Sequence, residues 1–81
     1  MNKLPKPTKT QVNTVKQTLA QVIYNRRTNL NVTQESLANN IGVDRKTINR
    51  IENEHFSPNL DTLVRIFTAL DIKSNSVFKT K

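Results

Sequence analysis

Five hydrogen-bonding side chains lie close together between positions 45 and 50 of the sequence. They are Arg45, Lys46, Thr47, Asn49 and Arg50. An arginine can donate two parallel hydrogen bonds to the major-groove edge of guanine, a lysine can reach the same acceptors, and an asparagine can pair with adenine. The same groups can instead contact phosphates alone, so both uses remain open. The cluster therefore indicates binding to double-stranded DNA, and we expect a binding site that contains guanines.

Four of these side chains, those of Arg45, Lys46, Asn49 and Arg50, need an element that turns them outward together. Ile48 and Ile51 are three positions apart, which places both on one face of a helix. Asp44 can cap the start of that helix through its carboxylate. We therefore predict a short helix after Asp44 that has an apolar inner face and a polar, basic outer face.

A second short helix is predicted just before it, with Thr33 as its N-cap. Its inner face is apolar and contains Leu37, Ala38 and Ile41. Gly42 is the only glycine of the chain, and we expect it to end this helix with a positive φ. Two helices can cross closely where the first has a small residue, which Ala38 supplies. Residues 33–53 are thus predicted to be a helix-turn-helix whose second helix can enter a major groove.

A longer helix is predicted before this unit, from Val12 to about Thr28. Its apolar residues recur at three- and four-residue spacing and share one stripe. They are Val12, Val15, Leu19, Val22 and Ile23. Leu30 and Val32 are expected to close the following connection over the core.

A fourth helix is predicted after a loop at 55–58, with Ser57 or Asn59 as its cap. Its apolar stripe contains Leu60, Leu63, Val64, Phe67 and Leu70. Residues 74–80 could add a fifth helical turn that docks Val77 and Phe78. No segment shows the alternation that a hairpin requires, so the predicted fold class is all-α with four to five helices.

The composition allows one domain with one modest core. The chain has 81 residues, of which 35% are hydrophobic, and this is too little for a catalytic domain beside a binding domain. There is no cysteine, which excludes disulfides and thiolate zinc sites. No apolar run is long enough to cross a bilayer, and the first residues lack the apolar stretch of a signal peptide. We expect a cytoplasmic protein without a membrane role.

The net charge of +7 favours polyanionic partners. Residues 1–27 contain no acidic side chain, and their basic ones are Lys3, Lys6, Lys9, Lys16, Arg26 and Arg27. Residues 1–10 are expected to form a disordered basic arm before a domain over 11–81. The lysines of this arm could wrap onto DNA or could belong to a solvated tail.

The chain resembles the Cro and phage-repressor family, also called the xenobiotic-response-element (XRE) family, over roughly residues 15 to 72. The resemblance rests on Thr33-Gln34, Leu37-Ala38, Ile41-Gly42-Val43, Ile48, Ile51-Glu52-Asn53, Pro58, Leu60 and Leu63-Val64. It implies a lambda-repressor-like fold and a DNA-binding domain.

Site residues follow from this resemblance by position. Gln34 and Asn53 match residues that contact DNA phosphates in the family. The residues that reach base edges correspond to Arg45, Lys46 and Arg50, with Thr47 and Asn49 as flanking candidates. Arg27 and Glu52 match a structural pair between the first and third helices, and an exposed Arg27 is the alternative.

For five further residues the sequence predicts loop conformation, position in the core or the lack of a metal role. Glu54 and Asp71 stand where glycines commonly end the third and fourth helices of the family, so the loops after them are expected to differ. Tyr24 and Phe56 are expected at the margin of the core, with a dimer surface as the alternative. His55 is a single histidine in a loop, and no metal role is expected for it.

The function implied by the resemblance is a sequence-specific transcriptional regulator, a repressor that binds a palindromic operator as a homodimer. One alternative is an antitoxin-like or anti-repressor module that uses the same fold to bind a protein partner. Another is a DNA-binding subdomain of a longer chain. Enzymatic activity, a cofactor and a small-molecule substrate are not expected, because no nucleophile–base pair, phosphate-binding loop or metal cluster can be assembled.

Overall fold

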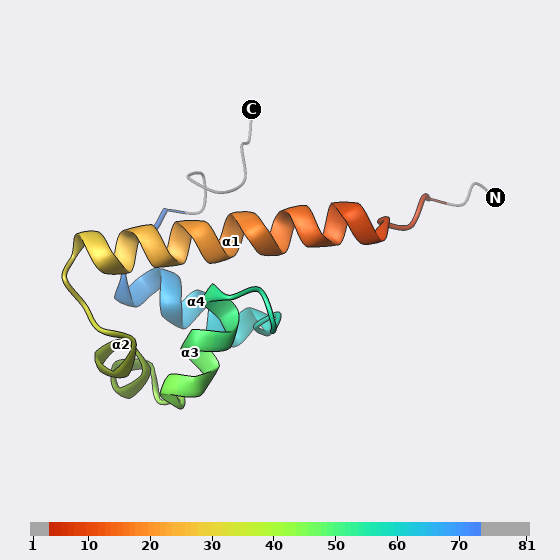
Figure 1. The fold of residues 1–81 in the computed structure, drawn as a ribbon. Helices are drawn as coiled ribbons and strands as arrows, with labels where there is room; N and C mark the ends of the chain where they lie inside the picture. The colour runs from red at the N-terminus through yellow and green to blue at the C-terminus, as the bar shows by residue number, and fades with distance from the viewer. Residues whose placement is uncertain (1–3, 74–81) are drawn as a thin grey trace.

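A computed structural model of the chain describes residues 4–73. These residues form four helices and no strand: α1 (Lys9–Asn29), α2 (Gln34–Ile41), α3 (Arg45–Glu52) and α4 (Leu60–Ala69). In Figure 1, α2, α3 and α4 lie below the C-terminal half of α1. The all-α prediction is confirmed. The fifth helical turn predicted at 74–80 lies outside the described residues.

One apolar core joins the four helices. Its buried side chains are Ile23, Leu37, Ala38, Ile41, Ile48, Ile51, Ile66 and Leu70. α2 packs against α3 and α4, and α1 packs against α3. Removal of this apolar surface from water is the main stabilising contribution. Val32 packs against the core as predicted, whereas Leu30 is exposed, so the expectation that it covers the core is wrong.

α1 begins at Lys9, earlier than the predicted start at Val12. The hydroxyl of Thr8 accepts a hydrogen bond from the backbone N–H of Gln11 at 3.0 Å, and the Gln11 side chain accepts one from the backbone N–H of Thr8 at 2.8 Å. This capping box satisfies two backbone donors that would otherwise lack partners. Lys9 and Thr10 are therefore helical, and the arm predicted over residues 1–10 is wrong at these two positions.

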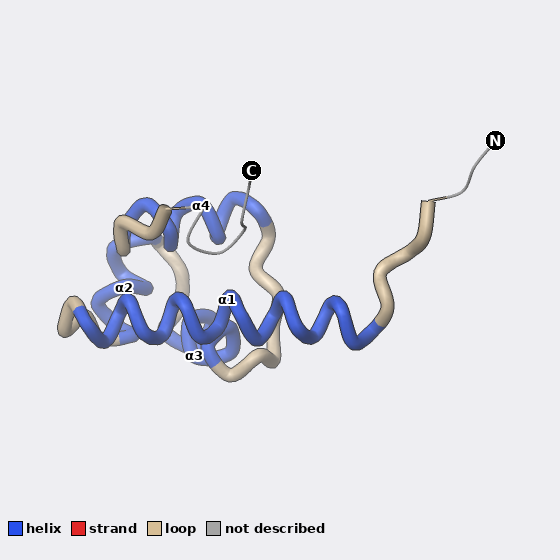
Figure 2. The backbone as a smooth tube through the Cα atoms, turned by 90° about the horizontal axis from the view of Figure 1, so that it is seen from above, coloured by secondary structure: helices blue, strands red, loops and turns tan. Residues whose placement is uncertain are grey.

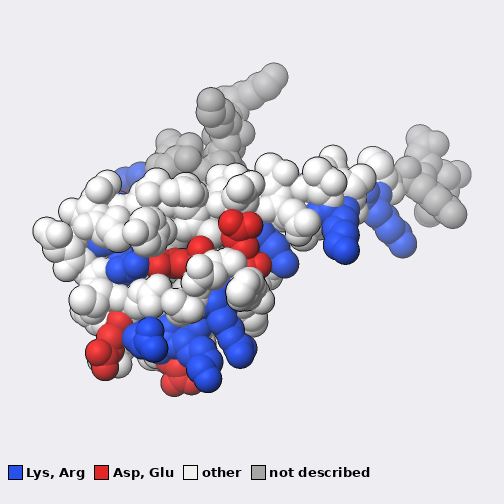
Figure 3. Space-filling model, viewed as in Figure 1, with Lys and Arg blue, Asp and Glu red and all other residues white. Residues whose placement is uncertain are grey.

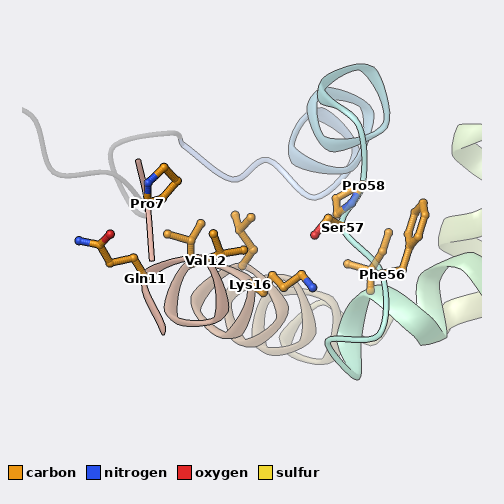
Figure 4. A pocket seen from close by; sticks show the side chains of 10 residues that line it. Pro7, Gln11, Val12, Lys16, Phe56, Ser57 and Pro58 are labelled. Atoms are coloured by element: carbon orange, nitrogen blue, oxygen red, sulfur yellow. The ribbon is translucent and has the colours of Figure 1, made fainter. Parts of the chain in front are cut away.

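The N-terminal half of α1 projects beyond the other helices (Figures 1 and 2). Ile23 is buried, whereas Val12 and Val15 are 42% and 46% exposed. With Phe56 and Pro58 of the loop before α4, these two valines line an open apolar groove of about 500 Å³ (Figure 4). The predicted stripe therefore exists, but the rest of residues 4–73 covers its first half only in part.

The turn between α2 and α3 has the predicted geometry. The Thr33 hydroxyl caps α2 by accepting a hydrogen bond from the N–H of Ser36 at 3.0 Å. Gly42 ends α2 with φ 78°. The N–H groups of Gly42 and Val43 both donate to the carbonyl of Ala38, each at 2.9 Å. The positive φ predicted for this glycine is confirmed, and this turn sets the angle at which α3 leaves α2.

Asp44 stands at the N-cap of α3 with the expected extended backbone, φ −77° and ψ 148°. Its side chain makes no capping hydrogen bond, so the predicted carboxylate cap is wrong. The backbone carbonyl of Asp44 already accepts the N–H of Thr47 at 2.9 Å. That backbone contact takes the donor that a capping carboxylate would use.

Each helix is followed by a residue with positive φ: Asn31, Gly42, Glu54 and Asp71. After Glu54, the N–H of His55 donates to the carbonyl of Arg50 at 2.8 Å, which is the Schellman arrangement. Ile72 donates in the same way to Phe67 at 2.8 Å. Glu54 and Asp71 thus keep the left-handed turn that favours glycine, and the expected change of these loops is not found.

α4 is rotated relative to its predicted stripe. Asn59 caps the helix, since its side chain accepts a hydrogen bond from the N–H of Thr62 at 2.8 Å. Ile66 is fully buried, whereas Leu60 and Val64 are 76% and 54% exposed. Because α4 meets α2 on one side, the face centred on Ile66 joins the core and the opposite edge of the stripe faces outward. The predicted inner position of these two exposed residues is wrong.

Candidate nucleic-acid interface

The outer face of α3 is basic and open. Arg45, Lys46 and Arg50 are exposed, while Ile48 and Ile51 on the other side of the helix are buried. Figure 3 shows Lys and Arg side chains gathered over α3 at the lower edge of the molecule. The helix therefore presents three exposed cationic groups on one surface, and its apolar side packs in the core.

The two flanking candidates lie at the edge of this surface. Thr47 and Asn49 are half-buried. The Nδ2 of Asn49 donates a hydrogen bond to Oε1 of Gln34 at 3.4 Å. Asn49 would have to exchange this contact to pair with an adenine edge. The structure thus separates three open basic residues from two partly covered polar ones.

Gln34 connects the basic face of α3 with Glu52 beneath it. Its Nε2 donates to Oε1 of Glu52 at 3.0 Å, and its Oε1 accepts from Nη1 of Arg45 at 3.5 Å as well as from Asn49. The first backbone N–H groups of a helix have no carbonyl partner within it, so an anion beside Gln34 would meet donors at the start of α2.

Gln34 and Asn53 line one shallow hollow of about 370 Å³. Glu52 and Tyr24 contribute to the same hollow. Asn53 follows α3, and its Nδ2 donates to the backbone carbonyl of Asn49 at 2.8 Å. The structure thus brings together the two residues for which the resemblance implies phosphate contacts.

Glu52, the last residue of α3, is held by Arg27 of α1. Nε of Arg27 donates to Oε2 at 2.6 Å and Nη2 donates to Oε1 at 2.9 Å. Nη1 of Arg27 donates to the carbonyl of Val32 at 2.7 Å. The two charged side chains are only 10% and 3% exposed, so the alternative of an exposed Arg27 does not hold. Each buried charge has its partner, as buried ion pairs require.

The environment of Arg27 favours its charged form. The hydrogen bond with Glu52 is the largest cause that raises the pKa of Arg27, and burial opposes it more weakly. The guanidinium also lies 5.5 Å from the centre of the Tyr24 ring, within the range of a cation–π contact. Tyr24 is 48% exposed, so it stands at the edge of the core and covers this pair.

Two further arginines hold helices together, and sequence reasoning missed both. Nε of Arg26 donates to the carbonyl of Leu70 at 2.8 Å, and Nη1 of Arg65 donates to the carbonyl of Ile41 at 3.2 Å. Both carbonyls lie at helix C-termini, where a cation is favoured. No sequence signal distinguishes these arginines from free surface groups, because their partners are backbone atoms.

Membrane-spanning helices and metal-type clusters are absent from the part of the chain that the structure describes. No helix there is long and apolar enough to cross a bilayer. No three His, Asp or Glu side chains of residues 4–73 are grouped so that they could hold a metal ion.

Comparison with known proteins agrees with this geometry. The model of the helix-turn-helix family matches residues 23–75, which is more than half of the chain and includes α2, the Gly42 turn and α3. No curated protein and no solved structure gives a significant match. The chain therefore belongs to the Cro/C1-type (XRE) helix-turn-helix family of DNA-binding regulatory domains.

Proposed function

We propose that this protein is a sequence-specific transcriptional repressor that binds a partly palindromic operator as a homodimer. The observation that carries the proposal is the exposed basic face of α3, which the Arg27–Glu52 pair holds at a fixed angle to α1. A helix with such a face fits a major groove about 12 Å wide. Two copies related by a two-fold axis would place their α3 helices in successive major grooves, about 34 Å apart.

The residues have distinct roles in this proposal. Those assigned to base edges are Arg45, Lys46 and Arg50, flanked by Thr47 and Asn49. Guanines are expected in each half-site because arginine and lysine both match its two major-groove acceptors. Gln34 and Asn53 would contact phosphates, and the hollow that they share supports this assignment. Such contacts fix the register of α3 in the groove without reading sequence.

Selection of bound duplexes from a random-sequence DNA pool tests the proposal. We expect a two-fold symmetric motif with guanines in each half, and two protein chains per selected duplex in sedimentation measurements. A single asymmetric half-site bound by one chain would contradict the homodimer. A pool that shows no enrichment would contradict sequence-specific binding itself.

A second candidate function is a protein-interaction module of the antitoxin-like or anti-repressor kind. The open apolar groove between α1 and the loop at Phe56 favours it, since exposed apolar surfaces often bind proteins. Competition separates the two candidates. A complex with a protein partner that persists in an excess of the selected duplex would favour this module over the repressor.

A further inference from the structure

Two lysines continue one face of α1 beyond the core. Lys9, Lys16 and Ile23 recur at seven-residue intervals, which is close to two helical turns, so they share one face of α1. Ile23 belongs to the core, and Arg27, one turn further on, pairs with Glu52 at the end of α3. The two lysines are therefore on the side of the helix that rests on α3. Lys9 is exposed on the projecting part of α1, whereas Lys16 is half-buried and lines the apolar groove beside Ile51 and Phe56.

Figure 3 shows basic side chains on the part of the chain that projects beyond the other helices. These side chains point to the same side of the molecule as the basic cluster over α3. Lys9 and Lys16 take part in none of the ion pairs found among residues 4–73. No acidic residue precedes Glu35 in the sequence, so no neighbour along α1 neutralises this charge.

Lys9 and Lys16 are part of a helix that is already formed in the free protein. The capping box of Thr8 and Gln11 fixes the start of α1, and the helix is continuous from Lys9 to Asn29. Seven residues rise about 10 Å along a helix, and this distance separates the Cα atoms of Lys9 and Lys16 along the axis of α1. The backbone entropy of ordering this segment is thus lost on folding and need not be lost again on binding.

We propose that the projecting half of α1 is a second DNA contact, which lies along the phosphate backbone beside the half-site that α3 occupies. This inference rests on the DNA-binding function proposed above. Lys9 and Lys16 would bind phosphates as point charges, so they would add affinity and salt dependence without sequence preference. They would also lengthen the DNA segment that each protein chain covers.

The substitutions Lys9→Gln and Lys16→Gln, singly and together in the full chain, test this proposal. Affinity is measured at several salt concentrations, for the selected duplex and for a scrambled one. Each substitution should lower the affinity several-fold at about 0.1 M salt, equally for both duplexes. Each should also reduce the slope of log K against log salt by about 0.9.

Lys73→Gln is the matched control. It removes the same charge, but Lys73 pairs with Asp71 at 3.7 Å and lies beside Val22 and Arg26, on a different face of α1 from Lys9 and Lys16. We expect its salt slope to equal that of the wild type. Thermal melts of all variants verify that each is folded.

Duplex length gives a second, positional readout. When the selected duplex is trimmed to the base pairs under α3, the wild type should lose affinity several-fold. The double variant Lys9→Gln/Lys16→Gln should lose much less, because the contact with the flanking phosphates is already gone. Equal losses for the two proteins would contradict the position that we assign to α1.

The outcomes separate this inference from the proposed function. Unchanged slopes in both lysine variants, with a wild type that still selects its operator, would overturn only the inference. A wild type without sequence preference would overturn the proposed function, while the slopes on scrambled DNA would still decide the role of the lysines. Binding of the wild type and of the lysine variants to anionic lipid vesicles is measured as well. If the variants lose vesicle binding while their DNA binding is unchanged, this face of α1 is a lipid-binding surface and the inference is overturned.

Discussion

Arg27 and Glu52 join the last turn of α1 to the last residue of α3 through two hydrogen bonds, of 2.6 and 2.9 Å. Gln34 of α2 donates a third hydrogen bond to the same carboxylate, at 3.0 Å. Three helices thus meet at Glu52. This carboxylate couples the stability of the fold to the angle at which the basic face of α3 is presented.

The first prediction concerns this pair. Glu52→Ala should lower the free energy of unfolding by about 3 kcal/mol, because it leaves the buried Arg27 guanidinium without its counter-charge. Urea unfolding of the two proteins measures the difference. The double variant Arg27→Met/Glu52→Met should lose less than the sum of the losses of Arg27→Met and Glu52→Met, since no buried charge remains unpaired. Strict additivity would show that the two side chains are not coupled.

The contribution of the Arg27–Glu52 pair to the free energy of unfolding should not change with pH on the alkaline side. The hydrogen bond with Glu52 raises the pKa of Arg27. A group whose pKa is raised by folding stabilises the protein fully below its unfolded-state pKa, and this contribution is lost only as the pH rises through the folded-state pKa. Both values lie well above about pH 10 for arginine. The unfolding free-energy difference between the wild type and the double Met variant should therefore be constant from about pH 7 to about pH 10, and a decrease over that range would contradict this account.

The next prediction concerns the recognition of DNA sequence by Arg50, on the exposed face of α3. Arg50→Ala should weaken binding to the selected duplex by about 1 to 3 kcal/mol and relax the preference at one operator position. Its melting temperature should stay close to that of the wild type, because the side chain is exposed. Titration of duplexes that differ at single positions measures both effects. Equal weakening for every duplex would instead make Arg50 a phosphate contact.

Glu54 is predicted to be a site where glycine stabilises the protein. Its φ of 64° is unfavourable for a residue with a Cβ atom, by about 1 kcal/mol. Glu54→Gly should therefore raise the melting temperature by roughly 4 to 8 °C. Asn31→Gly is the control, because asparagine tolerates its φ of 57° better and should gain less. A larger gain at Asn31 would refute this explanation.

Gly42 should show the reverse effect, through the backbone alone. A Cβ atom at this position would meet no other atom within 4 Å, so only its φ of 78° opposes a side chain. We expect Gly42→Asn to be mild, Gly42→Ala to cost about 1 to 2 kcal/mol, and Gly42→Val to cost more because of its branched Cβ. Unfolding midpoints of the three variants give the order. Equal stability of the Val variant and the wild type would contradict the turn geometry.

The sequence was most informative where the signal is local. Thr33 as a cap, Gly42 as a left-handed stop, and Ile48 and Ile51 as the inner face of α3 each depend on neighbours within a few residues. Periodicity shows which side chains share a face, but not whether another helix covers that face. For this reason the sequence predicts the stripe of α1, including Val12 and Val15, but not that these two residues are exposed.

The sequence predicts which residues of the candidate site are exposed better than it predicts the hydrogen bonds between them. The open position of Arg45, Lys46 and Arg50 follows from helical periodicity. The engagement of Gln34 with Glu52 does not, because it depends on the crossing of α2 and α3 and on side-chain rotamers. Nor does the sequence show that Glu54 adopts the positive φ that a glycine usually adopts at this position.

The central claim is that the basic face of α3 reads a DNA sequence, and one titration tests it most directly. The affinity for the selected duplex is compared with that for a scrambled duplex of the same length at two salt concentrations. We predict a preference of at least about 10³-fold at both, because base contacts persist while the phosphate contribution weakens with salt. Equal, steeply salt-dependent affinity for both duplexes would contradict the claim and would leave a basic domain that contacts only phosphates.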